Sequence, residues 1–265
     1  MVGLRPDSFG KPNYRREDMK IAARTDKGKL RKLNEDLYYV DEKSNLLVIV
    51  DGVGGHNAGD VASQIAVAVF HEWVEGMICQ QPADFDVSLD EKLRILKQLA
   101  IEANRRIYQY SQQNNSLDGM GTTLIAGFLM PSHLVYVHVG DSRIYVLRDG
   151  VIQQITKDHS LVQEMVDRDV LTLQEARIHP QRNIISRAVG LDLTVEIDCG
   201  MHPVHSEDVI LVCTDGLHDM ITDDTEIANL IASAPDLDAA SRGLIDKALD
   251  YGGEDNVTLI LATLS

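Results

Sequence analysis

Four aspartates flank strand-like runs in a pattern that could gather them at one place. Asp36 comes just before the run Leu37–Val40, and Asp51 comes just after the run Leu46–Val50. If these runs pair as an antiparallel hairpin around residues 42–45, the start of the first strand lies beside the end of the second. Asp36 and Asp51 then meet at the open end of the hairpin.

The same arrangement recurs in the C-terminal half. Asp215 follows the run Val209–Cys213, and Asp255 precedes the run Val257–Leu264. Four converged carboxylates repel one another unless cations neutralise them. Oxygen ligands without His or Cys suit Mg²⁺ or Mn²⁺ rather than zinc. The spacing makes a site for two metal ions a candidate, and ordinary Asp-Gly turns are the alternative that it leaves open.

Alternating strand and helix signals predict the scaffold for these residues. Asp149-Gly150 is typical of a two-residue hairpin turn, and capping-box patterns begin at Ser88 and Thr172. Apolar spacing predicts helices from about Asp60 to Trp73, from Ser88 to about Tyr110 and over Leu237–Leu249. The further strands that we expect are Thr122–Met130, Leu134–Val139, Ile144–Arg148, Val151–Thr156 and Val195–Cys199.

Strands joined by short turns, with the helices in blocks, favour one particular fold class. The pattern predicts an α+β fold of antiparallel sheets with helices packed outside, and not a doubly wound parallel sheet. We expect a flexible basic tail over residues 1–19 and a single domain over residues 20–265, since no linker divides the chain.

Composition excludes several classes of protein. The net charge is −16, with ten Lys or Arg and four Asp or Glu in the first 32 residues but 15 and 37 in the remainder. A body so acidic is not expected to bind nucleic acid, which needs clustered cations. No apolar run approaches the ~18 residues of a membrane span, and the first residues lack the apolar core of a secretory signal. With three scattered cysteines, a cytoplasmic protein is the expectation.

Seven short segments along the chain form a pattern. They are Thr25-Asp26-Lys27-Gly28 through Asn34-Glu35-Asp36, Asp51-Gly52-Val53-Gly54-Gly55-His56, Gly119-Met120-Gly121-Thr122-Thr123, Val139-Gly140-Asp141-Ser142-Arg143, Thr156-Lys157-Asp158-His159-Ser160, Thr214-Asp215-Gly216-Leu217 and Asp255-Asn256-Val257-Thr258. In this order they resemble the motifs of the metal-dependent serine/threonine protein phosphatases of the protein phosphatase 2C type, and the chain looks closest to bacterial single-domain members. The similarity covers residues 21–264, and seven motifs in sequence are far more specific than any one of them.

The resemblance implies a four-layer α-β-β-α sandwich of two antiparallel sheets flanked by helices. It also implies two Mn²⁺ or Mg²⁺ ions and water activated between them for the hydrolysis of phosphoserine and phosphothreonine. Asp141 matches the position that, with Asp215, helps to hold a third ion, and Asp219 is a further candidate there. Arg31 matches the arginine that binds the substrate phosphate. The implied ligands of the two ions are Asp36, Asp51, the backbone carbonyl of Gly52, Asp215 and Asp255.

Two features of the resemblance bear on the substrate and the leaving group. Residues 158–189 match the flap that borders the active site in bacterial members, where packing on the body and substrate recognition are both open interpretations. Eukaryotic members carry His directly after Asp-Gly, whereas this chain has Val53. His56, His159 and His218 are the candidates for a general acid, and metal-bound water is the alternative.

The expected partners are phosphorylated proteins, including a serine/threonine kinase that the phosphatase opposes, and the expected state is a monomer. Two other functions remain open. The chain could be an inactive binding module on the same fold, against which the complete aspartate set argues, or a metal-dependent hydrolase of small phosphoesters.

Overall fold

Every strand pairing in the computed structural model, which describes residues 19–54, 58–80 and 87–264, is antiparallel. The strands are β1 (Met19–Asp26), β2 (Asp36–Asp41), β3 (Leu46–Val53), β4 (Gly121–Thr122), β5 (Leu124–Met130), β6 (His133–Val139), β7 (Arg143–Arg148), β8 (Val151–Gln154), β9 (Asp198–Pro203), β10 (Val209–Cys213) and β11 (Val257–Leu264). One sheet has the order β1-β11-β10-β7-β8, and the other has the order β2-β3-β5-β6-β9, with β4 beside β3.

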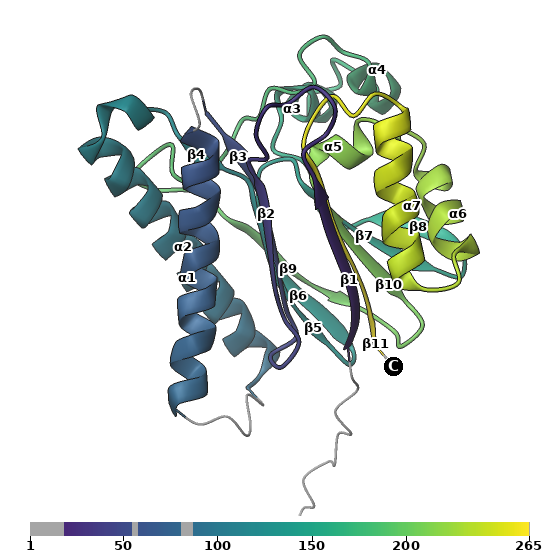
Figure 1. Cartoon of the computed structure of the whole chain (residues 1–265), viewed down its shortest axis with the longest axis horizontal. Helices are drawn as coiled ribbons and strands as arrows, with labels where there is room; N and C mark the ends of the chain where they lie inside the picture. The colour runs from purple at the N-terminus through teal and green to yellow at the C-terminus, as the bar shows by residue number, and fades with distance from the viewer. Residues whose placement is uncertain (1–18, 55–57, 81–86, 265) are drawn as a thin grey trace, which may run out of the picture.

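Helices cover the outer face of each sheet (Figure 1). In Figure 1, α1 and α2 flank the sheet that contains β2 and β3, and α6 and α7 flank the sheet that contains β1 and β11. The helices are α1 (Ala58–Gln80), α2 (Leu89–Gln113), the 3₁₀ turn η1 (Asn115–Leu117), α3 (Leu161–Asp167), α4 (Leu173–Arg177), α5 (Asp215–His218), α6 (Asp224–Ser233) and α7 (Leu237–Asp250). The expected α+β sandwich of two antiparallel sheets between helices is confirmed.

Strand alternation produces three apolar layers in this sandwich. In β3, Leu46, Val48 and Val50 pack toward α1 and α2, while Leu47 and Ile49 pack between the two sheets. Because successive side chains of a strand point to opposite faces, a strand buried on both sides is apolar throughout. A rigid double sheet of this kind fixes the strand ends that carry the aspartates.

Local signals correctly placed several turns and helix starts. Asp149 and Gly150 both have positive φ, 51° and 78°, as a two-residue hairpin between β7 and β8 requires. The Ser88 side chain accepts from the N–H of Glu91 at the start of α2. Thr172 and Glu175 form a complete capping box at α4.

Some expected boundaries differ from the structure. The strand expected over Val195–Cys199 is wrong in its bounds, because β9 spans Asp198–Pro203. Val195 and Ile197 are apolar without belonging to a strand, since they pack against the apolar layer under α1 and α2. Met19, expected in the tail, is the first residue of β1, while the other tail residues lie outside the described part. Within the described residues, no helix has both the length and the hydrophobicity that crossing a membrane demands.

Candidate metal centre and active site

The first two aspartates meet as the hairpin predicts. β2 and β3 pair with Asp36 directly opposite Asp51. Directly opposed side chains of an antiparallel pair have Cβ atoms about 4.5–5.5 Å apart. The fold therefore forces two carboxyl groups together at one end of a sheet.

The second pair of aspartates lies at the corresponding end of the other sheet. β10 and β11 are antiparallel neighbours, and the Thr214 N–H extends their pairing by donating to the Thr258 carbonyl at 3.0 Å. Asp215 follows this point, and Asp255 precedes β11. The glycine after Asp215 is needed for close approach, because a Cβ on Gly216 would lie 2.0 Å from the backbone oxygen of Asn256.

The two pairs form one electrostatic cluster. The pKa of Asp51 is raised well above its usual range by burial and then by the carboxylates of Asp36 and Asp215, with smaller effects from Asp141 and Asp255. Burial raises the pKa of Asp36 to about 7 and that of Asp215 to about 8, and the nearby Asp255 carboxylate adds to both increases. Four of the aspartates that the sequence predicts as ligands, Asp36, Asp141, Asp215 and Asp255, thus lie close enough to Asp51 to shift its pKa.

Two oxygens in this cluster have unused bonding capacity. Asp36 Oδ1 and Asp215 Oδ1 are buried and have no hydrogen-bond partner among the described residues. A buried carboxylate oxygen without a partner is costly unless a cation or a donor satisfies it. Among the described residues, no group of three or more His, Cys, Asp or Glu side chains is arranged so that it could hold one metal ion by itself. Asp36 Oδ1 and Asp215 Oδ1 are the oxygens in this cluster that a cation could satisfy.

The glycine after Asp51 also allows a close approach. A Cβ on Gly52 would lie 2.3 Å from the carbonyl oxygen of Gly59, in the first turn of α1. The helix and the end of β3 are in contact through backbone, and this fixes the peptide that follows Asp51. This packing is a structural reason for the Asp-Gly sequence in addition to any role of the Gly52 carbonyl.

Arg31 lies beside the cluster and is held by it. Its Nη2 is 2.5 Å from Asp255 Oδ2, and its side chain is 48% exposed. Burial lowers the pKa of Arg31, but the carboxylates of Asp255, Asp215 and Asp51 together more than compensate, so the net shift of the pKa is upward. The guanidinium is therefore charged and placed at the edge of the carboxylate cluster.

Asn256, which the sequence interpretation did not single out as a functional residue, fixes the loop that carries Arg31. Its side chain is 3% exposed. It donates to the carbonyls of Lys27 and Leu33 at 2.8 and 2.9 Å, and it accepts from the N–H of Glu35 at 2.8 Å. One buried amide thus attaches both sides of the Arg31 loop to β11. Its position directly after Asp255 was the only available signal.

Asp141 lies in a turn that other buried groups immobilise. His218 Nε2 is 3.2 Å from the Asp141 carbonyl oxygen, and Thr123 Oγ1 is 2.8 Å from Ser142 Oγ. Thr123 Oγ1 also accepts from the Asp51 N–H at 3.0 Å. Burial raises the pKa of Asp141 well above its usual range, and the Asp215 carboxylate adds to the increase. The turn is thus connected to the cluster through both backbone and side chains.

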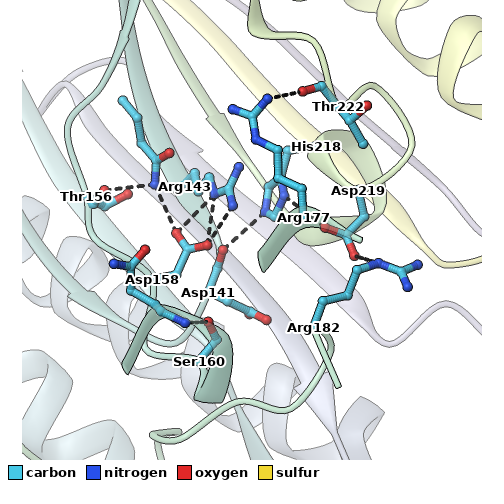
Figure 2. Close-up of polar contacts among 12 residues, drawn as sticks. Asp141, Arg143, Thr156, Asp158, Ser160, Arg177, Arg182, His218, Asp219 and Thr222 are labelled. Atoms are coloured by element: carbon cyan, nitrogen blue, oxygen red, sulfur yellow. Dashed lines mark hydrogen bonds and ion pairs between the residues drawn. The ribbon is translucent and has the colours of Figure 1, made fainter. Parts of the chain in front are cut away.

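The residues expected to form a flap, 158–189, pack against the body near Asp141. A cavity of about 220 Å³ lies at this junction. Figure 2 shows Asp141 and Asp219 on its body side and Arg177 and Arg182 reaching from the flap side. Arg182 Nε is 3.3 Å from Asp219 Oδ2, and Arg177 donates to the Thr222 carbonyl at 2.6 Å. Both arginines therefore bind the body in this conformation.

The three histidines that were candidates for a general acid differ in their positions. His56 lies outside the described residues. His159 is buried, its Nδ1 accepts from the Gly140 N–H at 3.0 Å, and its Nε2 lies 3.4 Å from Asp198. His218 is equally buried, and its Nδ1 lies 3.3 Å from Asp219. His159 and His218 thus hold the backbone near Asp141.

A sequence family model for protein phosphatase 2C matches residues 30–246. The chain belongs to the protein phosphatase 2C family. Among its relatives, "Serine/threonine phosphatase stp" of Listeria monocytogenes is 38% identical over 242 residues, covering 90% of this chain and 93% of the relative.

Solved structures of this family have the same fold. The crystal structure of the Mycobacterium tuberculosis serine/threonine phosphatase PstP/Ppp superposes with a TM-score of 0.83 at 38% identity, covering 94% of this chain and 99% of that one. A structure of the PstP catalytic domain in complex with two manganese ions has a TM-score of 0.80 at 36% identity, covering 93% of this chain and 98% of that one.

Proposed function

We propose that the protein hydrolyses phosphoserine and phosphothreonine in proteins with water activated by two divalent metal ions. One observation carries this proposal: Asp36, Asp51, Asp215 and Asp255 converge, and Asp36 Oδ1 and Asp215 Oδ1 are buried without a partner among the described residues. A family member whose structure contains two manganese ions supports the choice of Mn²⁺, and Mg²⁺ is the alternative that shares the preference for oxygen ligands.

The residues that would hold two ions are Asp36, Asp51, the Gly52 carbonyl, Asp215 and Asp255. Asp141 would help to hold a third with Asp215, and Asp219 is its further candidate ligand. Divalent ions bound there would lower the pKa of water and neutralise charge on the phosphoryl group. The carboxylates must be ionised to bind them, so binding releases the protons that the raised pKa values retain.

The chain itself supplies the group that recognises the phosphate. Arg31 has a planar guanidinium suited to two phosphoryl oxygens at once. In the structure this group pairs with Asp255, so engagement of Asp255 with a metal ion would free the guanidinium for substrate. The loop attachment by Asn256 keeps Arg31 near the cluster during this exchange.

The flap, residues 158–189, would contribute to the choice of protein substrate. It borders the Asp141 side of the cluster, and it exposes large apolar side chains, including Leu173 at 64% and Ile178 at 82%. Exposed apolar groups beside a reactive site suit contact with an extended peptide. We further propose that the enzyme is a cytoplasmic monomer and that it opposes a serine/threonine kinase.

The cost of the cluster argues against a pure binding module on this fold. Raised carboxyl pKa values mean that ionisation destabilises the folded chain. A module that only binds partners gains nothing from this cost, whereas a metal-dependent enzyme recovers it when the ions bind.

Hydrolysis of a phosphothreonine peptide and of a nucleoside monophosphate, each with Mn²⁺, tests the proposal. The unsubstituted protein is expected to prefer the peptide, and Asp51→Asn is expected to abolish turnover. Asp246→Asn, which changes an exposed aspartate of α7, is the matched control and should retain activity. Faster hydrolysis of the nucleotide would indicate a small-molecule phosphoesterase, and full activity of Asp51→Asn would contradict the metal-dependent mechanism.

A further inference from the structure

A buried hydroxyl group connects the two sheets beside the carboxylate cluster. Thr214 follows β10 in one sheet, and its side chain is fully buried. Its Oγ1 donates to Oδ2 of Asp36, the first residue of β2 in the other sheet, at 2.9 Å. The two residues are 178 positions apart in sequence.

The neighbours of this hydroxyl fix the direction of the bond. The backbone N–H of Thr258 donates to Thr214 Oγ1 at 3.0 Å, so the hydroxyl oxygen already accepts one hydrogen bond. Its own proton can go to Asp36 Oδ2 at 2.9 Å or to the Thr258 carbonyl at 3.4 Å. Only the shorter distance lies within the normal range of an O–H···O hydrogen bond. Thr214 therefore donates to Asp36.

The two oxygens of the Asp36 carboxylate consequently have different surroundings. Oδ2 is held by the protein, while Oδ1 is buried with no partner among the described residues. A hydrogen bond to one oxygen limits rotation of the carboxylate about its terminal torsion, which is otherwise a broad energy well. The free oxygen is consequently held in one place opposite Asp51 rather than sampling several positions.

We propose that Thr214 is a positioning residue whose hydroxyl orients Asp36 so that one carboxylate oxygen remains available to a divalent ion. The inference rests on the metal-dependent function proposed above and adds a named group that determines ion affinity. Partners that hydrogen-bond metal ligands typically change metal affinity or activity by ~10- to 100-fold when they are removed. Thr214 directly precedes Asp215 in the chain and hydrogen-bonds Asp36, so it connects a proposed metal ligand of one sheet with a proposed metal ligand of the other.

Thr214→Val and Thr214→Ser separate the hydroxyl from the shape of the side chain. Valine keeps the branched volume but cannot donate, and serine keeps the donor. Calorimetry on the full chain, stripped with EDTA and titrated with Mn²⁺ without substrate, measures ion affinity apart from turnover. Thr214→Val is expected to weaken Mn²⁺ binding by roughly 10- to 100-fold, and Thr214→Ser is expected to bind close to the unsubstituted protein.

Thr263→Val is the matched control, because its hydroxyl donates to the Asp208 carbonyl at 2.9 Å near the other end of β11. It should leave Mn²⁺ affinity unchanged. Equal Mn²⁺ affinity in Thr214→Val and the unsubstituted protein would overturn the inference, as would equal losses in the valine and serine variants. If Thr214→Val does not fold, Thr214→Ala tests the loss of the same donor. If both variants fail to fold while Thr214→Ser folds normally, the hydroxyl is needed for stability alone, and the inference is overturned. An unsubstituted protein that binds no Mn²⁺ would overturn the proposed function itself.

Discussion

Asp36 and Asp51 stand directly opposite each other where β2 and β3 pair. Like charges in this position destabilise a sheet, and the raised pKa values of both residues have burial as their largest cause. The hairpin therefore keeps an arrangement that is unfavourable for folding and useful for binding a cation.

Replacing one of these carboxyl groups should stabilise the metal-free protein. Asp36→Asn removes a charge from the cluster, and its amide oxygen can still accept the hydrogen bond from Thr214. We expect the free energy of unfolding in EDTA at pH 8 to rise by on the order of 2 kcal/mol. Urea denaturation measures this change, and a loss of stability would contradict the cost that we assign to burying the Asp36 carboxylate.

The metal-free protein should lose stability as the pH rises from 6.5 to 8.5. Folded-state pKa values of about 7 for Asp36 and about 8 for Asp215 lie above the ordinary value of 3.8. The folded chain thus binds more protons than the unfolded chain in this window, so the free energy of unfolding falls as these groups ionise. Below pH 6.5 the buried His138, whose pKa burial lowers to about 4, adds the opposite dependence.

Denaturation midpoints in EDTA and in Mn²⁺ across this window measure the effect. Added Mn²⁺ should stabilise the protein more at pH 8.5 than at pH 6.5, because it competes with fewer protons. Asp36→Asn in EDTA should show a shallower pH dependence. A flat profile of the unsubstituted protein would contradict the raised pKa values.

Substitution of Arg31 should impair substrate recognition more than metal binding. Loss of even one charge-assisted hydrogen bond to phosphate, worth about 1.5–3 kcal/mol, predicts a fall in kcat/KM of at least roughly 10- to 100-fold for Arg31→Ala. Arg31→Lys should recover only part of this loss, because an ammonium group lacks the planar fork. Steady-state kinetics with a phosphothreonine peptide measures both.

Arg242→Ala provides the matched control for this prediction. Arg242 is an exposed arginine of α7 that pairs with Asp238, and its loss should leave kcat/KM unchanged. If Arg31→Ala and Arg242→Ala behave alike, Arg31 does not bind the phosphate.

The ion pair at the base of the flap should be important for stability. Arg143 contacts Asp158 through Nε at 3.0 Å and Nη2 at 2.7 Å, and both side chains are largely buried. Arg143→Met leaves the Asp158 carboxylate without its cation, and we expect a loss of about 3 kcal/mol in the free energy of unfolding.

Two further variants decide the origin of that loss. The double variant Arg143→Met with Asp158→Leu should be more stable than the single variant, because no unpaired charge remains. Arg94→Ala, which removes an exposed partner of Glu91 on α2, should change stability by less than about 0.5 kcal/mol. A double variant less stable than Arg143→Met would contradict this explanation.

The sequence carried enough information for the β2–β3 hairpin because strand ends and turn are local features. Two apolar runs separated by a short polar segment allow one antiparallel pairing in which Asp36 opposes Asp51. An α+β fold of antiparallel sheets with helices outside was likewise predictable, from short turns between strands and from helices in blocks. The four-layer arrangement was an expectation from the family resemblance.

Contacts between distant segments could not be predicted in the same way. The bond from Thr214 to Asp36 crosses between sheets, and the three bonds of Asn256 reach a loop more than 220 positions away. The residue type alone does not predict such a role, because threonine and asparagine side chains can equally form hydrogen bonds with nearby backbone groups. The shift of β9 to Asp198–Pro203 has a similar origin, because apolar residues before it pack without pairing.

Hydrolysis of a phosphothreonine peptide by the unsubstituted protein, measured with Mn²⁺, with Mg²⁺ and after EDTA, tests the central claim most directly. The carboxylate cluster predicts turnover that requires a divalent ion, disappears with EDTA and returns when Mn²⁺ is restored in excess. Undiminished hydrolysis in EDTA, or no turnover by folded protein with either ion, would contradict a metal-dependent phosphatase.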